Sequence, residues 1–156
     1  MAFCEKCGTK LGEGASFCGS CGVKIATTEV NRIDIDALYN EAFNAGLKCY
    51  KSEQRDKAIE YFTEAIQLKP DSVDAYVNRA AMYNNKQDFY KAIADFTEAI
   101  RLRPDHHMYR DRGDRYIQIG EYAKAVADYE VALKSDPNNA DTKNNLAVAK
   151  RRLEKE

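Results

Sequence analysis

Four of the five cysteines in this chain lie in two closely spaced pairs near its beginning. The pattern is C-x2-C-x10-C-x2-C, formed by Cys4, Cys7, Cys18 and Cys21. Two residues between paired cysteines allow one tight turn to direct both sulfurs at a single ion, and two such turns complete a tetrahedral four-sulfur site. A segment this short cannot fold around an apolar core of its own. The pattern therefore predicts a structural zinc site.

The surroundings of the two cysteine pairs are alike. Each pair reads Phe-Cys-x-x-Cys-Gly, and Gly8 and Gly22 stand where a left-handed residue can close the turn. This doubled motif resembles the zinc-ribbon modules of bacteria and archaea over roughly residues 1–25, which implies a closed site of four thiolates. Such a site has no open position for catalysis. The spacing alone leaves an iron site open, whereas a dithiol redox centre lacks the usual surrounding βαβ pattern.

The rest of the chain contains one helical stretch three times. KAIADFTEAIRLRP occupies residues 91–104, and related stretches occupy 57–70 and 124–137, so the period is 34 and then 33 residues. Apolar residues recur at helical spacing; in the middle copy they are Ala92, Ile93, Phe96, Ala99 and Ile100. A proline closes each copy, because proline lacks an N–H and disfavours the α conformation in the residue before it. A helical period of this length predicts a stacked array.

A second helical pattern precedes each copy, with a small residue at an equivalent place: Gly46, Ala80 and Gly113. A small side chain there allows the two helices of a pair to approach closely. This order of small residues, aromatic residues and proline resembles the tetratricopeptide repeat over about residues 35–138. The resemblance implies an all-α fold, a right-handed superhelical array of helix-turn-helix repeats.

We expect three parts along the chain: a zinc ribbon at 1–25, a linker at 26–33 and a repeat domain at 34–156. The repeats are expected at about 39–72, 73–105 and 106–138, followed by a capping helix at about 139–154. A capping helix with a polar outer face is needed because the last repeat would otherwise expose apolar surface.

Charge and composition argue against several classes of function. The net charge is −1, so no basic field draws the protein to nucleic acid or to an anionic membrane. With no apolar signal segment and no run of about 18 apolar residues, we expect a cytoplasmic protein with no membrane association. No constellation typical of catalysis appears, so we expect a non-catalytic protein. The only histidines, His106 and His107, are adjacent, and we expect them to point apart as turn residues.

The first helices of the pairs should line the concave side of the array. Projection from the core positions predicts a peptide-binding groove formed by Asn40, Phe43, Asn44, Leu47, Tyr50, Asp74, Asn78, Asn85, Arg110, Asp111 and Asp114. Asn44 and Asn78 occupy equivalent places, and side-chain amides can pair with the backbone of an extended peptide. Arg110 would serve as a charged anchor.

The expected function is a protein–protein interaction module or scaffold that binds a peptide segment of a partner protein. Some tetratricopeptide proteins clamp the terminal carboxylate of a chaperone tail with five lysine, asparagine and arginine side chains. Asn78 matches one clamp position, whereas Phe43, Leu47, His107 and Asp111 stand at the others, so chaperone tails are expected to be disfavoured. The alternative is a nucleic-acid-associated factor in which the ribbon contacts RNA or DNA.

Overall fold

The computed structural model describes residues 4, 6–9, 17–23 and 34–155. The chain divides into two compact units, Met1–Asp34 and Ile35–Glu156. The predicted linker and parts of the predicted ribbon lie outside the described residues, so the proposed boundary between them stays a prediction. Among the described residues, no helix combines the length and the apolar character needed to cross a bilayer.

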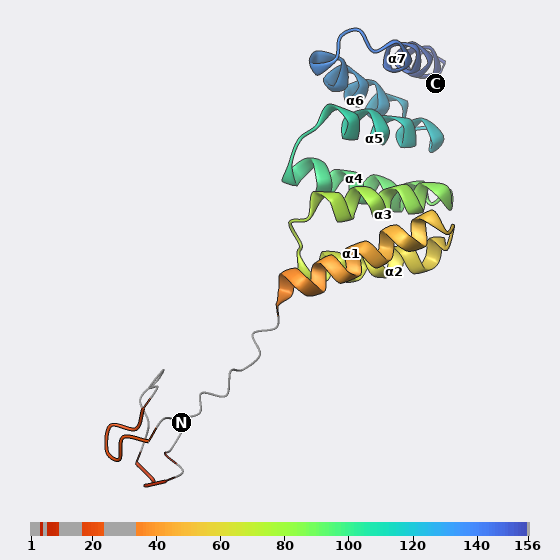
Figure 1. The fold of residues 1–156 in the computed structure, drawn as a ribbon. Helices are drawn as coiled ribbons and strands as arrows, with labels where there is room; N and C mark the ends of the chain where they lie inside the picture. Colours follow the sequence, from red (N-terminus) through yellow and green to blue (C-terminus); the bar gives the residue numbers. More distant parts are fainter. Residues whose placement is uncertain (1–3, 5, 10–16, 24–33, 156) are drawn as a thin grey trace. The chain divides into compact units, whose positions relative to one another are not determined.

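The second unit is built entirely of helices within its described residues, in agreement with the predicted all-α repeat fold (Figure 1). In chain order they are α1 (Ile35–Lys51), α2 (Arg55–Leu68), α3 (Val73–Asn85), α4 (Phe89–Leu102), α5 (His106–Gln118), α6 (Tyr122–Ser135) and α7 (Ala140–Leu153). Consecutive helices pack as the pairs α1–α2, α3–α4 and α5–α6, and α7 packs on α6. Contacts of α2 with α3 and of α4 with α5 join one pair to the next.

The ends of the second helices are determined by the prolines. α2, α4 and α6 each end two residues before Pro70, Pro104 and Pro137 respectively, as the restriction that proline places on the preceding residue predicts. The turn between the two helices has a similar backbone conformation in all three pairs. One residue of each turn has a positive φ: 57° at Glu53, 61° at Gln87 and 80° at Gly120. Only the glycine adopts this left-handed conformation without a steric cost.

Side chains cap the first turn of several helices. Ser72, Asp88, Asp105 and Asn139 each accept a hydrogen bond from a main-chain N–H of α3, α4, α5 or α7, with donor–acceptor distances of 2.9 to 3.3 Å. These bonds satisfy N–H groups that have no partner within the helix. The polar residues between the repeated stretches therefore determine where the next helix begins.

The core alternates small and aromatic side chains. Phe62 of α2 is fully buried between Ala58 and Ala65, and Tyr129 of α6 is fully buried in the same way. A Cβ atom added to Gly46 would lie 2.6 Å from the ring of Phe62, and one added to Gly113 would lie 2.9 Å from the ring of Tyr129. The aromatic rings thus lie directly against the backbone of the preceding helix, which explains the small residues at these places.

Two arginines form buried polar links between neighbouring pairs. Arg79 of α3 donates two hydrogen bonds to Asp95 of α4, and its third nitrogen donates to the hydroxyl of Thr63 in α2 at 2.9 Å. Arg112 of α5 makes the same contacts with Asp128 of α6, at 2.8 Å each, and with Thr97 of α4 at 3.0 Å. Each guanidinium also lies over two tyrosine rings, with centroids 5.6 to 5.9 Å away. These links connect α3 and α5 each to the helix before it and the helix after it.

Candidate functional site

The four predicted metal ligands come together in the first unit. The sulfur atoms of Cys4, Cys7, Cys18 and Cys21 all lie within 4.8 Å of one another. The Sγ–Sγ distance is 3.6 Å between Cys4 and Cys21 and 3.5 Å between Cys7 and Cys18. A tetrahedral zinc ion with Zn–S bonds of about 2.3 Å separates its sulfur ligands by about 3.8 Å. The spacing of the four sulfurs therefore fits a tetrahedral metal ion.

The two halves of the cluster have the same turn geometry. Gly8 N donates to Cys4 O at 2.8 Å, and Gly22 N donates to Cys18 O at 2.9 Å. Cys4 N and Cys18 N in turn donate to the carbonyls of Thr9 and Val23. Both glycines are left-handed, with φ of 70° and 64°. These two equivalent turns direct all four sulfurs to one point.

The pKa values of the thiols in the cluster differ because each thiol has different hydrogen bonds and lies close to the other sulfur atoms. A hydrogen bond with the Thr9 side chain lowers the pKa of Cys7 to about 6. The pKa of Cys21 is raised to about 12, because burial and the neighbouring thiols outweigh the hydrogen bond from the Val23 backbone. Four thiolates at this spacing repel one another, so full ionisation of the cluster requires a cation between them. Soft thiolate donors of this kind suit zinc or iron.

The predicted groove residues of the first pair differ in exposure. Asn40, Asn44 and Tyr50 of α1 are exposed. Phe43 and Leu47 are half-buried and pack against core residues. The ring centroid of Phe43 lies 5.7 Å from that of Phe62. Only part of the predicted surface of α1 is therefore open to a ligand.

In the second pair, α3 presents Asp74 and Asn85 as exposed side chains. Asn78 is half-buried, and its Nδ2 donates to the main-chain oxygen of Asp74 at 2.7 Å. One N–H of this amide is thus used by its own helix.

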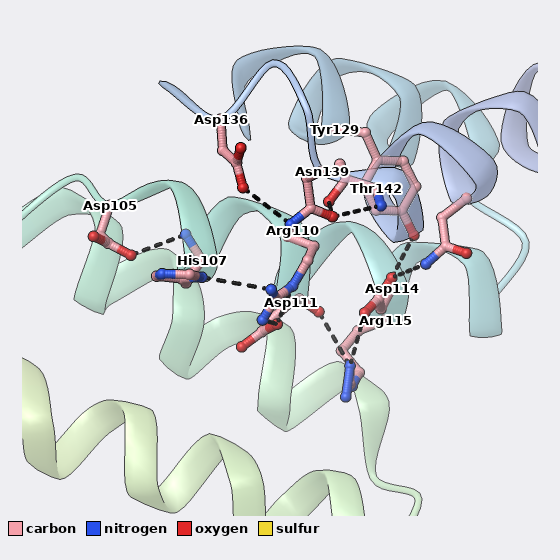
Figure 2. Close-up of polar contacts among 11 residues, drawn as sticks. Asp105, His107, Arg110, Asp111, Asp114, Arg115, Tyr129, Asp136, Asn139 and Thr142 are labelled. Atoms are coloured by element: carbon pink, nitrogen blue, oxygen red, sulfur yellow. Dashed lines mark hydrogen bonds and ion pairs between the residues drawn. The ribbon is translucent and has the colours of Figure 1, made fainter. Parts of the chain in front are cut away.

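On α5, Arg110 pairs with its neighbour Asp111 (Figure 2). Arg110 Nε and Nη2 lie 3.0 Å and 2.7 Å from Asp111 Oδ1. The hydrogen bond to Asp111 raises the pKa of Arg110. The charge of the predicted anchor is thereby largely balanced within α5.

The two histidines are arranged differently from the expectation that they point apart. The ring centroids of His106 and His107 are 3.9 Å apart, with 37° between the ring planes. Asp105 caps α5 by accepting a hydrogen bond from His107 N, which brings both residues into the first turn of the helix. Arg110 Nη1 lies 3.5 Å from His107 Nδ1, and this positive charge opposes cation binding at the histidine pair.

An open cavity of about 640 Å³ lies among α3, α5, α6 and α7. Its lining includes Asp114, together with Asn84 and Gln118, which the same helical projection places on the groove side, and Arg115, Asn145 and Val148 among others. Tyr129 Oη donates to Asp114 Oδ1 at 2.7 Å, and Asn145 Nδ2 donates to the same oxygen at 3.0 Å. Figure 2 shows Tyr129 approaching Asp114 from α6. Arg115 Nε donates to Asn84 Oδ1 at 2.6 Å, which connects α5 to α3.

Asn145 and Arg115 are among the lining residues that sequence reasoning missed. Asn145 lies on α7, which was expected to serve only as a cap. The repeat period contains the signal for it, because Asn44, Asn78, Asp111 and Asn145 follow one another at intervals of 34, 33 and 34 residues. α7 therefore continues the series of first helices, in addition to covering the last pair.

Comparison with known proteins identifies the repeats. The family model described as tetratricopeptide repeat matches residues 39–72 and 73–106, and one described as TPR repeat matches residues 113–153. The three matches confirm the three predicted repeats, and the last of them runs through α7.

Curated relatives and solved structures agree with the repeat assignment. The chain is 30% identical over 119 residues to the Hsp70-Hsp90 organising protein of Plasmodium falciparum (isolate 3D7), covering 71% of this chain and 21% of the relative. It spans about a fifth of the length of the curated relatives it matches.

Two similar solved structures contain peptides. The first TPR domain of Spaghetti (RPAP3) bound to the HSP90 peptide SRMEEVD matches with a TM-score of 0.69 and 26% identity, over 75% of this chain and 94% of that one. The second TPR domain of human RPAP3 in complex with the HSP70 peptide SGPTIEEVD matches with a TM-score of 0.69 and 25% identity, over 74% and 98%.

These similarities correct the expectation that chaperone C-terminal tails are disfavoured, since similar domains hold such peptides. The expectation was wrong because it considered only five contacts to the terminal carboxylate, whereas a groove contacts an extended peptide along its length. The prediction of a non-catalytic protein agrees with the family, whose members are interaction modules. The chain belongs to the tetratricopeptide repeat family and carries a three-repeat protein-interaction module.

Proposed function

We propose that the helical unit binds an extended peptide segment of a partner protein along the side lined by α1, α3, α5 and α7. The observation that carries this proposal is the open cavity of about 640 Å³, whose lining combines carboxamide, carboxylate and guanidinium groups. Similar domains that hold peptides at 25–26% identity support it. The C-terminal tails of Hsp90 and Hsp70 are therefore among the candidate ligands.

The chemistry of the proposed groove suits a peptide backbone. An extended peptide presents one N–H and one C=O per residue, and a side-chain amide can pair with both. Asn44, Asn78 and Asn145 place such amides at equivalent positions of three helices, and Asp111 places an acceptor on the helix between the last two. Asn44, Asn78 and Asp111, which were proposed from the sequence, thus provide one polar side chain in each of the three repeats.

We also propose that Cys4, Cys7, Cys18 and Cys21 hold a structural zinc ion, with iron as the alternative. The sulfur spacing and the two equivalent left-handed turns support this assignment. A bound ion would supply the positive charge that four close thiolates need, and the binding energy would hold the short segment folded.

The peptide proposal can be tested with defined ligands. Fluorescence anisotropy of labelled SRMEEVD and SGPTIEEVD, together with selection from a random peptide library on the immobilised full chain, should yield binding sequences. The Asn44→Ala/Asn78→Ala variant should bind selected peptides about tenfold or more weakly, since each lost hydrogen bond contributes about 1 kcal/mol. Asn144→Ala, an exposed amide on α7, is the matched control. Failure of every peptide to bind, or equal affinity of the double variant and the control, would refute the proposal.

A further inference from the structure

The cavity among α3, α5, α6 and α7 contains a carboxylate held in place by two hydrogen bonds. Tyr129 Oη and Asn145 Nδ2 both donate to Oδ1 of Asp114, at 2.7 Å and 3.0 Å. Tyr129 is fully buried, and burial raises the pKa of its phenol well above the usual range. Its hydroxyl therefore remains a proton donor under all ordinary conditions, and Asp114 is held in one orientation.

The second oxygen of Asp114 differs from the first. The nearest charged partner of Oδ2 is Arg115 Nη1 at 4.0 Å, which is longer than a hydrogen bond. Arg115 makes its own close contacts elsewhere, to Asn84 Oδ1 at 2.6 Å and to the main-chain oxygen of Asp111 at 3.2 Å. The side chain of Asp114 is about one-third exposed (32%) and lines the cavity. Oδ2 is thus an acceptor available to a ligand.

The charge of the cavity lining is balanced. Asp114 and Arg115 are its charged members, and they have opposite signs. Four carboxamides, those of Asn84, Gln87, Gln118 and Asn145, make up most of the remaining polar lining. A charged ligand side chain entering this space would lose water without gaining an unbalanced counter-charge. An uncharged donor would lose less and could still bind Oδ2.

We propose that this cavity is a specificity pocket of the peptide groove, which takes an uncharged hydrogen-bond-donating side chain (Asn, Gln, Ser or Thr) onto Asp114 Oδ2. Tyr129 and Asn145 act as positioning residues for that carboxylate, and α7 thereby contributes to ligand selection. The inference rests on the proposed peptide-binding function and names the chemistry of one ligand position.

The test is selection from a random peptide library on the full, zinc-supplemented chain. Peptides selected on the wild type should share one position restricted to Asn, Gln, Ser or Thr. That restriction should disappear with Asp114→Asn and with Asn145→Ala, and it should remain with Asn144→Ala. Thermal unfolding of each variant shows that the fold is retained.

A cavity-filling variant separates ligand binding from structural support. Val148 lines the cavity and is 44% exposed, so Val148→Trp fills the space without removing a member of the hydrogen-bond network. It should weaken the selected peptides about tenfold or more. Ala147→Trp, at the exposed neighbouring position, should not weaken them.

Three outcomes would overturn the pocket assignment. A shared position occupied by Lys, Arg, Asp or Glu would contradict the charge argument. If binding of the selected peptides depends on Asn44 and Asn78 but is unaffected by Asp114→Asn and Val148→Trp, the pocket assignment is wrong and the proposed groove function still stands. A selection that enriches no binding peptide would overturn both proposals.

Discussion

Arg79 and Asp95 form a bidentate ion pair between α3 and α4, with Nε–Oδ2 and Nη2–Oδ1 distances of 2.8 Å and 2.7 Å. The Asp95 side chain is only 6% exposed and that of Arg79 is 16% exposed. Since Arg79 also donates to Thr63 of α2, one guanidinium joins helices of two neighbouring pairs.

Removing the carboxylate of this pair should destabilise the helical unit strongly. Asp95→Ala leaves the Arg79 charge buried without its partner, and such changes cost about 3–5 kcal/mol. Urea unfolding followed by circular dichroism measures the loss. Glu98→Ala is the control, because the Glu98–Arg101 pair on α4 is exposed and should contribute less than about 1 kcal/mol. Equal effects of the two substitutions would contradict the assigned role.

Gly113→Ala should destabilise the fold through overpacking. The added Cβ would lie 2.9 Å from the Tyr129 ring, which is fully buried and cannot move aside freely. Overpacking of this kind costs about 1–3 kcal/mol. Gly46→Ala should behave alike, with Phe62 in the place of Tyr129.

The predicted clash between a Cβ atom at position 46 and the Phe62 ring can be tested by measuring the thermal stability of a double variant. Phe62→Leu shortens the side chain that Gly46→Ala would contact, so the double variant should lose less stability than the sum of the two single changes. Additive losses would show that the helices adjust in some other way.

The stability of the N-terminus of α4 should depend on acid pH. Asp88 Oδ2 lies 2.7 Å from Lys91 Nζ, and its other oxygen accepts a hydrogen bond from Lys91 N. The hydrogen bond with the Lys91 side chain lowers the pKa of Asp88 below its ordinary value of 3.8. Because the folded-state pKa is the lower one, the stabilisation is complete above about pH 4 and is lost as the pH falls through the folded-state value.

The measurement is urea unfolding between about pH 6 and pH 2. Wild type should lose more free energy of unfolding over this range than Asp88→Asn, which keeps a capping oxygen but cannot titrate. The difference should stay below about 1 kcal/mol because the pair is partly exposed. Glu60→Gln, at an exposed position of α2, is the control. Identical pH profiles for wild type and Asp88→Asn would count against the ion pair.

Metal content should depend on the four clustered cysteines and not on the fifth. Cys18→Ser removes a buried ligand of the cluster, so elemental analysis of purified protein should show loss of about one zinc ion per chain. Cys49→Ser, in the helical unit, should retain it. If the purified wild-type chain contains neither zinc nor iron, the proposed metal site is wrong.

The sequence was sufficient to predict the helical array because its signals are local and periodic. The closing prolines, the alanines around each aromatic residue and the small residues at Gly46 and Gly113 each depend on the neighbouring turn or the adjacent helix. A three-fold repetition of such signals reinforces each one. The cysteine cluster was predictable for the same reason, since each pair occupies one turn.

The remaining features depend on partners far apart in the chain. The links from Arg79 and Arg112 join residues 15 or 16 positions apart on different helices, and a repeated helical pattern does not reveal which side chains meet. Placement of Phe43 against Phe62 likewise comes from packing between helices. The place of Asn145 in the series Asn44, Asn78, Asp111 and Asn145 could have been found from the repeat period alone, but α7 was interpreted only as a cap.

The arginine links also distinguish the first pair of helices from the second and third pairs. The positions equivalent to Arg79 and Asp95 in the first pair are Ala45 and Tyr61, so α1 and α2 have no buried ion pair of this kind between them. In a linear stack each pair is stabilised mainly by its neighbours. The first pair should therefore open more readily than the two pairs that contain an Arg–Asp link, and a peptide lying across α1, α3, α5 and α7 would hold α1 against the rest of the array.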